Sequence, residues 1–306
     1  MGFLFSWDQI QRERIPGPED FDCVRSQVTE ALYPHPGVVA ASVYGSVVRG
    51  DHNWRSDLDL IVICRNAEEL CVRGSVVELM SDAFNRRVVI VPHVYTVSEA
   101  RSGQHPLGPS YRFTLARLAN NGVASGRVHQ YLVCRDNDIR VEMCKRILSA
   151  RRCVAIAHAQ FWEMVPNGAH DDMERWLAQR EVQGGYRFRI FHLYVNIARW
   201  LLWWHHCSLI NDGKRAVCEA VINNGLFRLV QRDFQILVEA DRAYDELLDD
   251  ALSGAVTRAE YLQKVLELTA MVFTVSIGLL RRASRLITAQ SVQSSRLTTS
   301  ARRAVA

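Results

Sequence analysis

The sequence predicts an α+β fold, in which a small α/β domain with a mixed sheet precedes an all-helical bundle. In the first part of the chain, short apolar runs rich in β-branched residues alternate with amphipathic helical patterns. Beyond about residue 138, long helical periods follow one another, separated by short turns that mostly contain Gly, Pro or Asn. We therefore expect a front domain at 1–137, a helical bundle at 138–290 and a flexible tail at 291–306.

The front domain is expected to hold strands at 38–44, 58–64 and 87–97 and helices at 20–33, 66–80 and 111–120. Pro34 and Gly37 end the first helix before the first strand. Pro92 cannot donate to a strand ladder, so the third strand is expected at an edge or a bulge. A mobile loop is expected at 102–110, which contains several Gly and Pro residues.

The second part of the chain shows six helical periods and no sustained heptad repeat. The expected helices are 139–164, 171–181, 187–207, 214–223, 227–248 and 258–288. Polar residues interrupt the apolar runs in two of them, at Arg199 and at Thr269, Thr274 and Ser276. Both runs are therefore expected to fall short of a membrane span.

Bulk composition points to an enzyme of the cytoplasm without a membrane anchor. Eight cysteines are scattered without a C-x-x-C pair or a zinc-like spacing, which favours free thiols in a reducing compartment. Charged residues near the N-terminus interrupt the apolar run that a signal peptide would need. The net charge of +4 suits an enzyme that handles anionic nucleotides but lacks the concentrated basic face of a nucleic-acid binder.

One motif carries most of the chemistry: Gly45-Ser46, with Arg49 three residues later, followed by Ser56-Asp57-Leu58-Asp59. Side chains alternate along a strand, so the two aspartates point the same way, with Cα atoms about 6–7 Å apart. Such a pair of like charges favours a hard divalent cation such as Mg²⁺ between them. Gly45 and Ser46 let a polyphosphate approach the backbone, and Arg49 can pair with phosphate oxygens.

These residues resemble the signature of the DNA polymerase β-like nucleotidyltransferase superfamily, in which a Gly-Ser precedes an Asp-x-Asp pair on the neighbouring strand. The two-domain arrangement is similar to that of aminoglycoside adenylyltransferases of the streptomycin/spectinomycin type. This resemblance implies Mg²⁺-dependent transfer of AMP from ATP to an acceptor hydroxyl, with release of pyrophosphate. It assigns Asp57 and Asp59 to the metal, and Gly45, Ser46, Arg49 and Ser56 to the nucleotide. It also implies that Lys214, which opens a helix after Asp212-Gly213, reaches the nucleotide phosphates.

The third strand departs from the family pattern because it carries no acidic residue. Among its inward positions, only His93 has a side chain that can accept a proton. Glu99, just past the strand, and Glu142, in the first helix of the second domain, are further candidates for the base. Either the base comes from the helical domain, or catalysis has weakened and the chain mainly binds nucleotide.

The acceptor is left open by the sequence. A small cationic molecule such as an aminoglycoside is the expectation that follows from the family. The alternatives are a protein or tRNA acceptor, as in toxin-like members, and a non-catalytic nucleotide sensor. The mild net charge and the lack of a basic stripe argue against a nucleic-acid partner.

Overall fold

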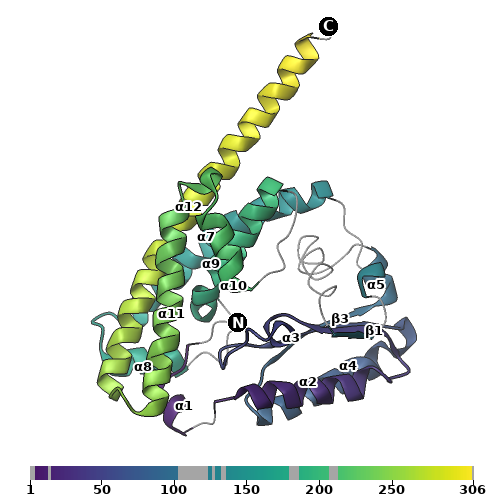
Figure 1. The fold of residues 1–306 in the computed structure, drawn as a ribbon, viewed down its shortest axis with the longest axis vertical. Coiled ribbons are helices and arrows are strands. Elements are labelled where there is room, and N and C mark those ends of the chain that lie inside the picture. Colours follow the sequence, from purple (N-terminus) through teal and green to yellow (C-terminus); the bar gives the residue numbers. More distant parts are fainter. Residues whose placement is uncertain are drawn as a thin grey trace. The chain divides into compact units, whose positions relative to one another are not determined.

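The computed structural model describes residues 4–12, 15–102, 123–125, 128–131, 136–178, 186–206 and 213–304. The chain divides into two compact units, shown in Figure 1. The front unit comprises Met1–Glu142 and Leu209–Gly213, and the helical unit comprises Met143–Ser208 and Lys214–Ala306. The small mixed sheet of the front unit and the mostly helical remainder confirm the predicted α+β class.

The sheet of the front unit has four strands in the order β3-β2-β1-β4. The strands are β1 (Val38–Tyr44), β2 (Leu58–Cys64), β3 (Ile90–Thr96) and β4 (Val123–Ser125). β1 runs antiparallel to β2 and to β4, whereas β2 and β3 are parallel. β3 lies at an edge, which confirms the expectation drawn from Pro92.

β3 begins later than the sequence predicts, at Ile90 rather than Arg87. The preceding residues close the end of a helix instead: the N–H of Arg87 donates to the Phe84 carbonyl, and that of Val88 to Ala83. Arg87 takes a positive φ of 62°, the backbone conformation that commonly ends helices. The β-branched residues that follow Arg87 made the sequence of this helix end resemble that of a strand.

Five helices and two 3₁₀ turns of the described residues also belong to the front unit. They are α1 (Trp7–Arg12), α2 (Pro18–Leu32), α3 (Ser46–Arg49), α4 (Glu69–Asn85, after a 3₁₀ turn at Asn66–Glu68), α5 (Val97–Ser102) and a 3₁₀ turn at Val128–Gln130. α2 starts where Pro18 follows Gly17, and the carboxylate of Asp20 accepts the Gly17 N–H at 2.9 Å. The loop expected at 102–110, apart from Ser102, and the helix expected at 111–120 lie outside the described residues.

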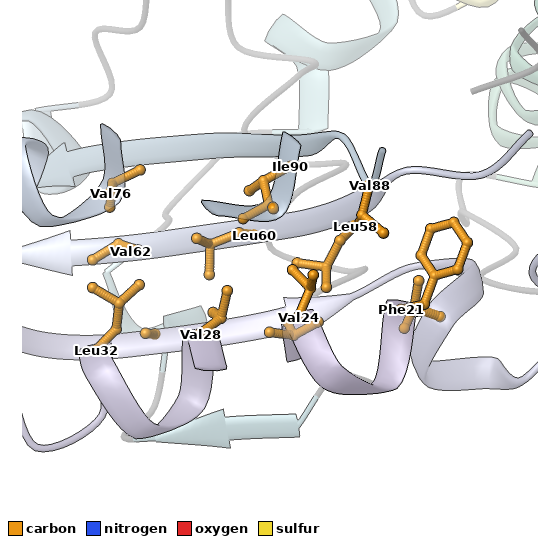
Figure 2. Packing of buried hydrophobic residues seen from close by; sticks show 14 of the residues in the cluster. Phe21, Val24, Val28, Leu32, Leu58, Leu60, Val62, Val76, Val88 and Ile90 are labelled. Atoms are coloured by element: carbon orange, nitrogen blue, oxygen red, sulfur yellow. The ribbon is translucent and has the colours of Figure 1, made fainter. Parts of the chain in front are cut away.

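α2 and α4 cover one face of the sheet (Figure 1). Phe21, Val24 and Val28 recur at helical spacing and point from α2 toward the strands. They meet the alternate side chains Leu58, Leu60 and Val62 of β2, as Figure 2 shows. The other residues of β2 face the opposite side of the sheet, where Ile61 and Ile63 pack near Tyr95. β2 is therefore buried on both faces, and only its beginning departs from apolar character.

The helical unit contains long helices at positions close to those predicted. They are α7 (Asp136–Met164), α8 (His170–Ala178), α9 (Tyr186–His206), α10 (Lys214–Ile222), α11 (Gln231–Ser253) and α12 (Arg258–Ala304). α11 begins four residues after the predicted start because a separate 3₁₀ turn occupies Gly225–Phe227, capped by the Asn224 side chain. α12 continues through 291–304, where a flexible tail is expected. Extending an existing helix is easier than starting a new one, because no new helical nucleus has to form.

An aromatic cluster forms part of the core of the helical unit. Phe161 lies with its ring centroid 5.0 Å from that of Trp176 and 5.5 Å from that of Phe273. Beside them, Trp162 donates its indole N–H to His158 Nε2 at 2.9 Å. Burial lowers the pKa of His158, and the accepted hydrogen bond likewise favours its neutral ring.

One helix of the described part, at Arg258–Thr288, is long and apolar enough to cross a membrane by length and composition. The sequence expectation was that this region falls short of a span. The helix is long and apolar enough because its apolar residues extend on the N-terminal side of Leu268. In the structure, 39% of this apolar window is buried. The cytoplasmic location stays a prediction.

The Asp233–Arg282 ion pair is expected to stabilise the helical unit. Arg282 of α12 donates from Nε and Nη2 to the two carboxylate oxygens of Asp233 on α11, at 2.6 and 2.5 Å. Asp233→Ala leaves a guanidinium without its partner beside a packed interface, so we expect unfolding free energy to fall by about 2–3 kcal/mol in urea titration. Glu219→Ala removes an exposed i,i+4 pair with Arg215 and should cost about 0.5 kcal/mol or less. Equal losses for the two variants would contradict this expectation.

Cysteine reactivity should follow burial. Burial raises the pKa of Cys218 to about 12, although Arg199 nearby lowers it in part. The thiolate is the reactive form, so Cys218 should resist a thiol reagent at pH 8 until the chain is unfolded in urea. Cys71 is exposed on α4 and should react in the folded protein. Mass spectrometry of labelled peptides measures both, and rapid labelling of Cys218 in the native chain would contradict the buried position.

Candidate functional site

Gly45 forms the turn that joins β1 to α3. Its φ is +84°, a conformation that side chains with a Cβ rarely adopt. A Cβ built at this position would also collide with Oδ2 of Asp59. The glycine is therefore required for two reasons, and the second one shows that an acidic side chain of the motif lies directly against this turn.

Asp57 and Asp59 lie at the start of β2. Tyr44, the last residue of β1, pairs with Asp59, which fixes the acid beside the Gly45 turn. Leu58 between the two acids packs into the core on the α2 and α4 side. Alternation therefore directs both carboxylates toward the opposite face, the side of Ile61. Asp57 is only 6% exposed, whereas Asp59 is partly accessible.

Ser46 and Arg49 are the first and last residues of α3, a single helical turn. Arg49 is held by Asp51, a residue that the sequence analysis did not assign to the site: Nη2 of Arg49 lies 3.1 Å from Oδ1 of Asp51. Gly50 between them has a φ of +75°, which turns the chain back so that this pair can form. A phosphate bound by Arg49 would therefore share the guanidinium with Asp51 or displace it.

Ser56 belongs to the loop that precedes β2. Its hydroxyl accepts the N–H of Asn53 at 3.0 Å, and its own N–H donates to the Asn53 carbonyl at 2.8 Å. The Asn53 side chain in turn accepts the Arg55 N–H at 3.1 Å. These bonds shape the loop that leads into Asp57, so the described role of Ser56 is to position the acids. Its contact with nucleotide stays a prediction.

The Asn53-x-x-Ser56 spacing was a signal for this loop that the sequence analysis missed. Asn and Ser side chains commonly bond to backbone groups two or three residues away and so stabilise tight turns. Arg55 within the loop is fully buried. The loop is therefore a packed part of the front unit.

The third strand places no acid beside the pair. Asp59 pairs with Val91 of β3, and Ile61 pairs with His93. His93 is therefore on the same face of the sheet as the acids. It lies two residues beyond the position paired with Asp59, which is about 7 Å further in the strand direction. Among the described residues, no group of three or more His, Cys, Asp or Glu side chains is arranged to hold a metal ion.

The other predicted residues fall in different places. Glu99 forms a capping box at the start of α5: its carboxylate accepts the Thr96 N–H at 2.9 Å, and its N–H donates to the Thr96 hydroxyl at 3.1 Å. This contact makes Glu99 a poor candidate for a base. Glu142 lies in α7, but it is assigned to the front unit and not to the helical unit as expected, and its side chain is outside the described part. Lys214 is the first residue of α10, in the helical unit.

The donor set fits a hard divalent cation bound together with its substrate. Asp57, just before β2, and Asp59, within it, supply carboxylate oxygens as ligands, and the Gly45 turn lies directly against Asp59. Mg²⁺ typically takes one or two carboxylates and completes its shell with phosphate oxygens and water. The absence of a third carboxylate at Val91 means that ligands from outside this pair are needed.

Comparison with known families agrees with this geometry. Residues 26–96 match the family model described as Polymerase beta, Nucleotidyltransferase. The matched segment runs from within α2 to the end of β3 and includes the glycine turn and both acids. No curated protein matches the chain.

The match covers less than half of the chain and makes the segment 26–96 similar to nucleotidyltransferase domains of the polymerase β kind. It ends before the helical unit. The resemblance to aminoglycoside adenylyltransferases therefore stays a prediction.

Gly45→Ala is expected to damage the site more than its conformation alone would explain. The control is Gly50→Ala, because Gly50 has a similar positive φ but open space where a Cβ would be. We expect Gly50→Ala, in the left-handed helical region, to lose about 1 kcal/mol of stability. Gly45→Ala should lose more, about 1–3 kcal/mol, because φ of 84° with ψ of −154° is a conformation essentially restricted to glycine. Only Gly45→Ala should also displace Asp59 and weaken Mg-ATP binding, by at least about tenfold in titration calorimetry. Equal binding by the two variants would contradict the close contact with Asp59.

Proposed function

We propose that this protein is a Mg²⁺-dependent nucleotidyltransferase that transfers AMP from ATP to an acceptor hydroxyl and releases pyrophosphate. The observation that carries the proposal is the contact between the Gly45 turn and Asp59, in a segment that matches the nucleotidyltransferase family model. The chemistry requires a phosphate-binding turn beside paired acids, and the contact of Gly45 with Asp59 supports such an arrangement.

In this proposal, Asp57 and Asp59 hold the cation, and the backbone at Gly45 and Ser46 receives the triphosphate. The burial of Asp57 supports its role, since a fixed carboxylate loses little freedom when it binds. Arg49 contributes charge to the phosphate oxygens, and Asp51 keeps its side chain near the turn. A cation bound here would offset the negative charge of the phosphates and of the leaving pyrophosphate.

The transfer forms one bond and breaks another. The acceptor oxygen bonds to the α-phosphorus of ATP, while the bond from that phosphorus to the bridging oxygen of pyrophosphate breaks. The acceptor proton passes to a base. His93, on the same face of the sheet as the acids, is one candidate, and Glu142 of α7 is the other.

We propose a small cationic acceptor of the aminoglycoside kind. Acidic residues at the end of α11 support a cationic ligand, since burial and the neighbours Asp245 and Asp250 raise the pKa of Asp249. The two neighbouring acids contribute to this shift after burial, and a cation bound among them would offset their mutual repulsion. Other acids are less suitable, because Asp171 pairs with Arg258 and Asp172 with Arg175.

A non-catalytic nucleotide sensor is the second candidate, and one observation favours it. Val91 stands opposite Asp59 in the strand where active members of the superfamily carry an acid. In this case the chain would bind Mg-ATP without turnover. A protein or tRNA acceptor is the third possibility and becomes an outcome of the same experiment.

The test uses the purified full-length chain with Mg²⁺ and ATP labelled at the α-phosphate, with and without aminoglycosides. We expect release of pyrophosphate and labelled drug only when an aminoglycoside is present. Label on protein or RNA would instead support the toxin-like alternative. Binding of Mg-ATP without turnover under any condition would support the sensor.

The variant Asp57→Asn with Asp59→Asn should lower transfer at least a hundredfold, because neutral amides bind Mg²⁺ far more weakly than carboxylates. Asp22→Asn, which changes an exposed acid of α2, is the matched control and should keep full activity. Circular dichroism checks that both variants are folded. If the double variant kept both transfer and metal-dependent ATP binding, the assignment of the acids would be wrong.

A further inference from the structure

α4 has two apolar faces, and only one of them contacts the sheet. Val72, Val76 and Ala83 are buried and form the inner face, and Figure 2 shows Val76 among the core residues. The outer face carries large apolar side chains that stay exposed: Leu70 at 86%, Val77 at 63%, Phe84 at 50% and Met80 at 37%. A helix at the surface of a domain usually presents polar residues on its outer side.

The exposed residues lie along one side of the helix. Leu70, Val77 and Phe84 are spaced by seven residues, which places them within about 40° of one another around the helix, and Met80 lies beside them. We call Leu70, Val77, Met80 and Phe84 the outer row. Val77, Met80 and Phe84 are direct neighbours in this row, whereas Arg73 and Gly74 separate Leu70 from Val77. Exposed apolar patches commonly mark interaction sites.

Two small residues, Gly74 and Ser81, lie along the same row. Gly74 costs a helix interior about 1 kcal/mol relative to alanine. No atom lies within 4 Å of the place where its Cβ would be, so the fold of the front unit does not require it. A small residue between large ones does permit close approach of a second helix.

The ends of α4 carry opposite charges. Glu68 and Glu69 stand at its start, whereas Arg86 and Arg87 follow its last residue. The guanidinium of Arg87 lies over the Phe84 ring, 5.6 Å from its centroid, so a positive charge borders the outer row at this end. These side-chain charges are opposite in sign to the helix dipole at each end, but they are larger, so each end still attracts the opposite end of an antiparallel copy. Within the chain, Glu69 also pairs with Arg73 and Arg86 with Asp20.

We propose that the outer row is the contact surface for a second copy of this chain, with the two α4 helices antiparallel about a two-fold axis near Val77. In this arrangement Leu70 of one copy faces Phe84 of the other, and Val77 meets its own equivalent. The acidic start of each helix lies beside the basic end of its partner. A parallel arrangement would bring like charges together at both ends. This inference is independent of the proposed catalytic activity.

The outer row alone provides less area than a standard interface, which buries about 800 Å² on each partner. The dimer is therefore expected to be weak and to depend on protein concentration. The apparent mass should rise from the monomer value of 34.8 kDa toward twice that value as concentration increases. Sedimentation equilibrium of the full chain over a wide concentration range measures this shift.

The first variant, Val77→Glu, places two like charges face to face at the axis and should weaken association at least tenfold. Leu252→Glu is the matched control, because Leu252 is an exposed apolar residue on α11, outside the outer row, and should leave association unchanged. A chain that is monomeric at every concentration overturns the proposal. Equal weakening of association by both variants would also overturn it. A third contradicting result is a loss of stability in Val77→Glu without any change in apparent mass, which would mean that the chain's own helical unit covers the outer row.

A charge exchange tests the antiparallel arrangement. Glu68→Arg alone and Arg87→Glu alone should each weaken association, since each places like charges at both ends of the pair. An equimolar mixture of the two variants should restore it, because every end then joins an acid to a base. Failure of the mixture to recover, or no effect of either single variant, would overturn the antiparallel pairing.

Discussion

The structure of the front unit depends on one constraint, the pairing of β1 with β2 at Tyr44 and Asp59. This register decides which side chains of β2 enter the core, since a shift of one residue would exchange its two faces. Leu58, Leu60 and Val62 pack against α2, and their burial holds the strand in place. The same register sets Asp59 against the Gly45 turn, so the packing of one face fixes the chemistry of the other.

The sequence predicted the strands that carry the site to the residue, because Val38–Tyr44 and Leu58–Cys64 are apolar runs bounded by turn residues. It was less successful where local patterns compete. Arg87 begins an apolar, β-branched stretch but belongs to a helix end. β4 has three residues and was missed, since so short a strand depends on its partner β1 and not on a pattern of its own.

The site shows the same division between local and tertiary information. Gly45, Asp57 and Asp59 follow from a motif that local geometry brings together, and this part was predictable. The bonds of Ser56 to Asn53 and of Arg49 to Asp51 depend on how the loop folds back, and the sequence gives no direct sign of the second bond. The position of Val91 opposite Asp59 needed the parallel register of β3, which follows from tertiary pairing.

Pro92 has a consequence for how copies of the chain can associate. It stands in the edge strand β3 and lacks the N–H that an added strand would need as a donor. Growth of the sheet by addition of a foreign strand is thus hindered at this edge, which protects the front unit from one common route to aggregation. In the proposed dimer, the copies would instead meet through side chains on a helix surface, where contact is reversible and the hydrogen bonds of the fold stay intact.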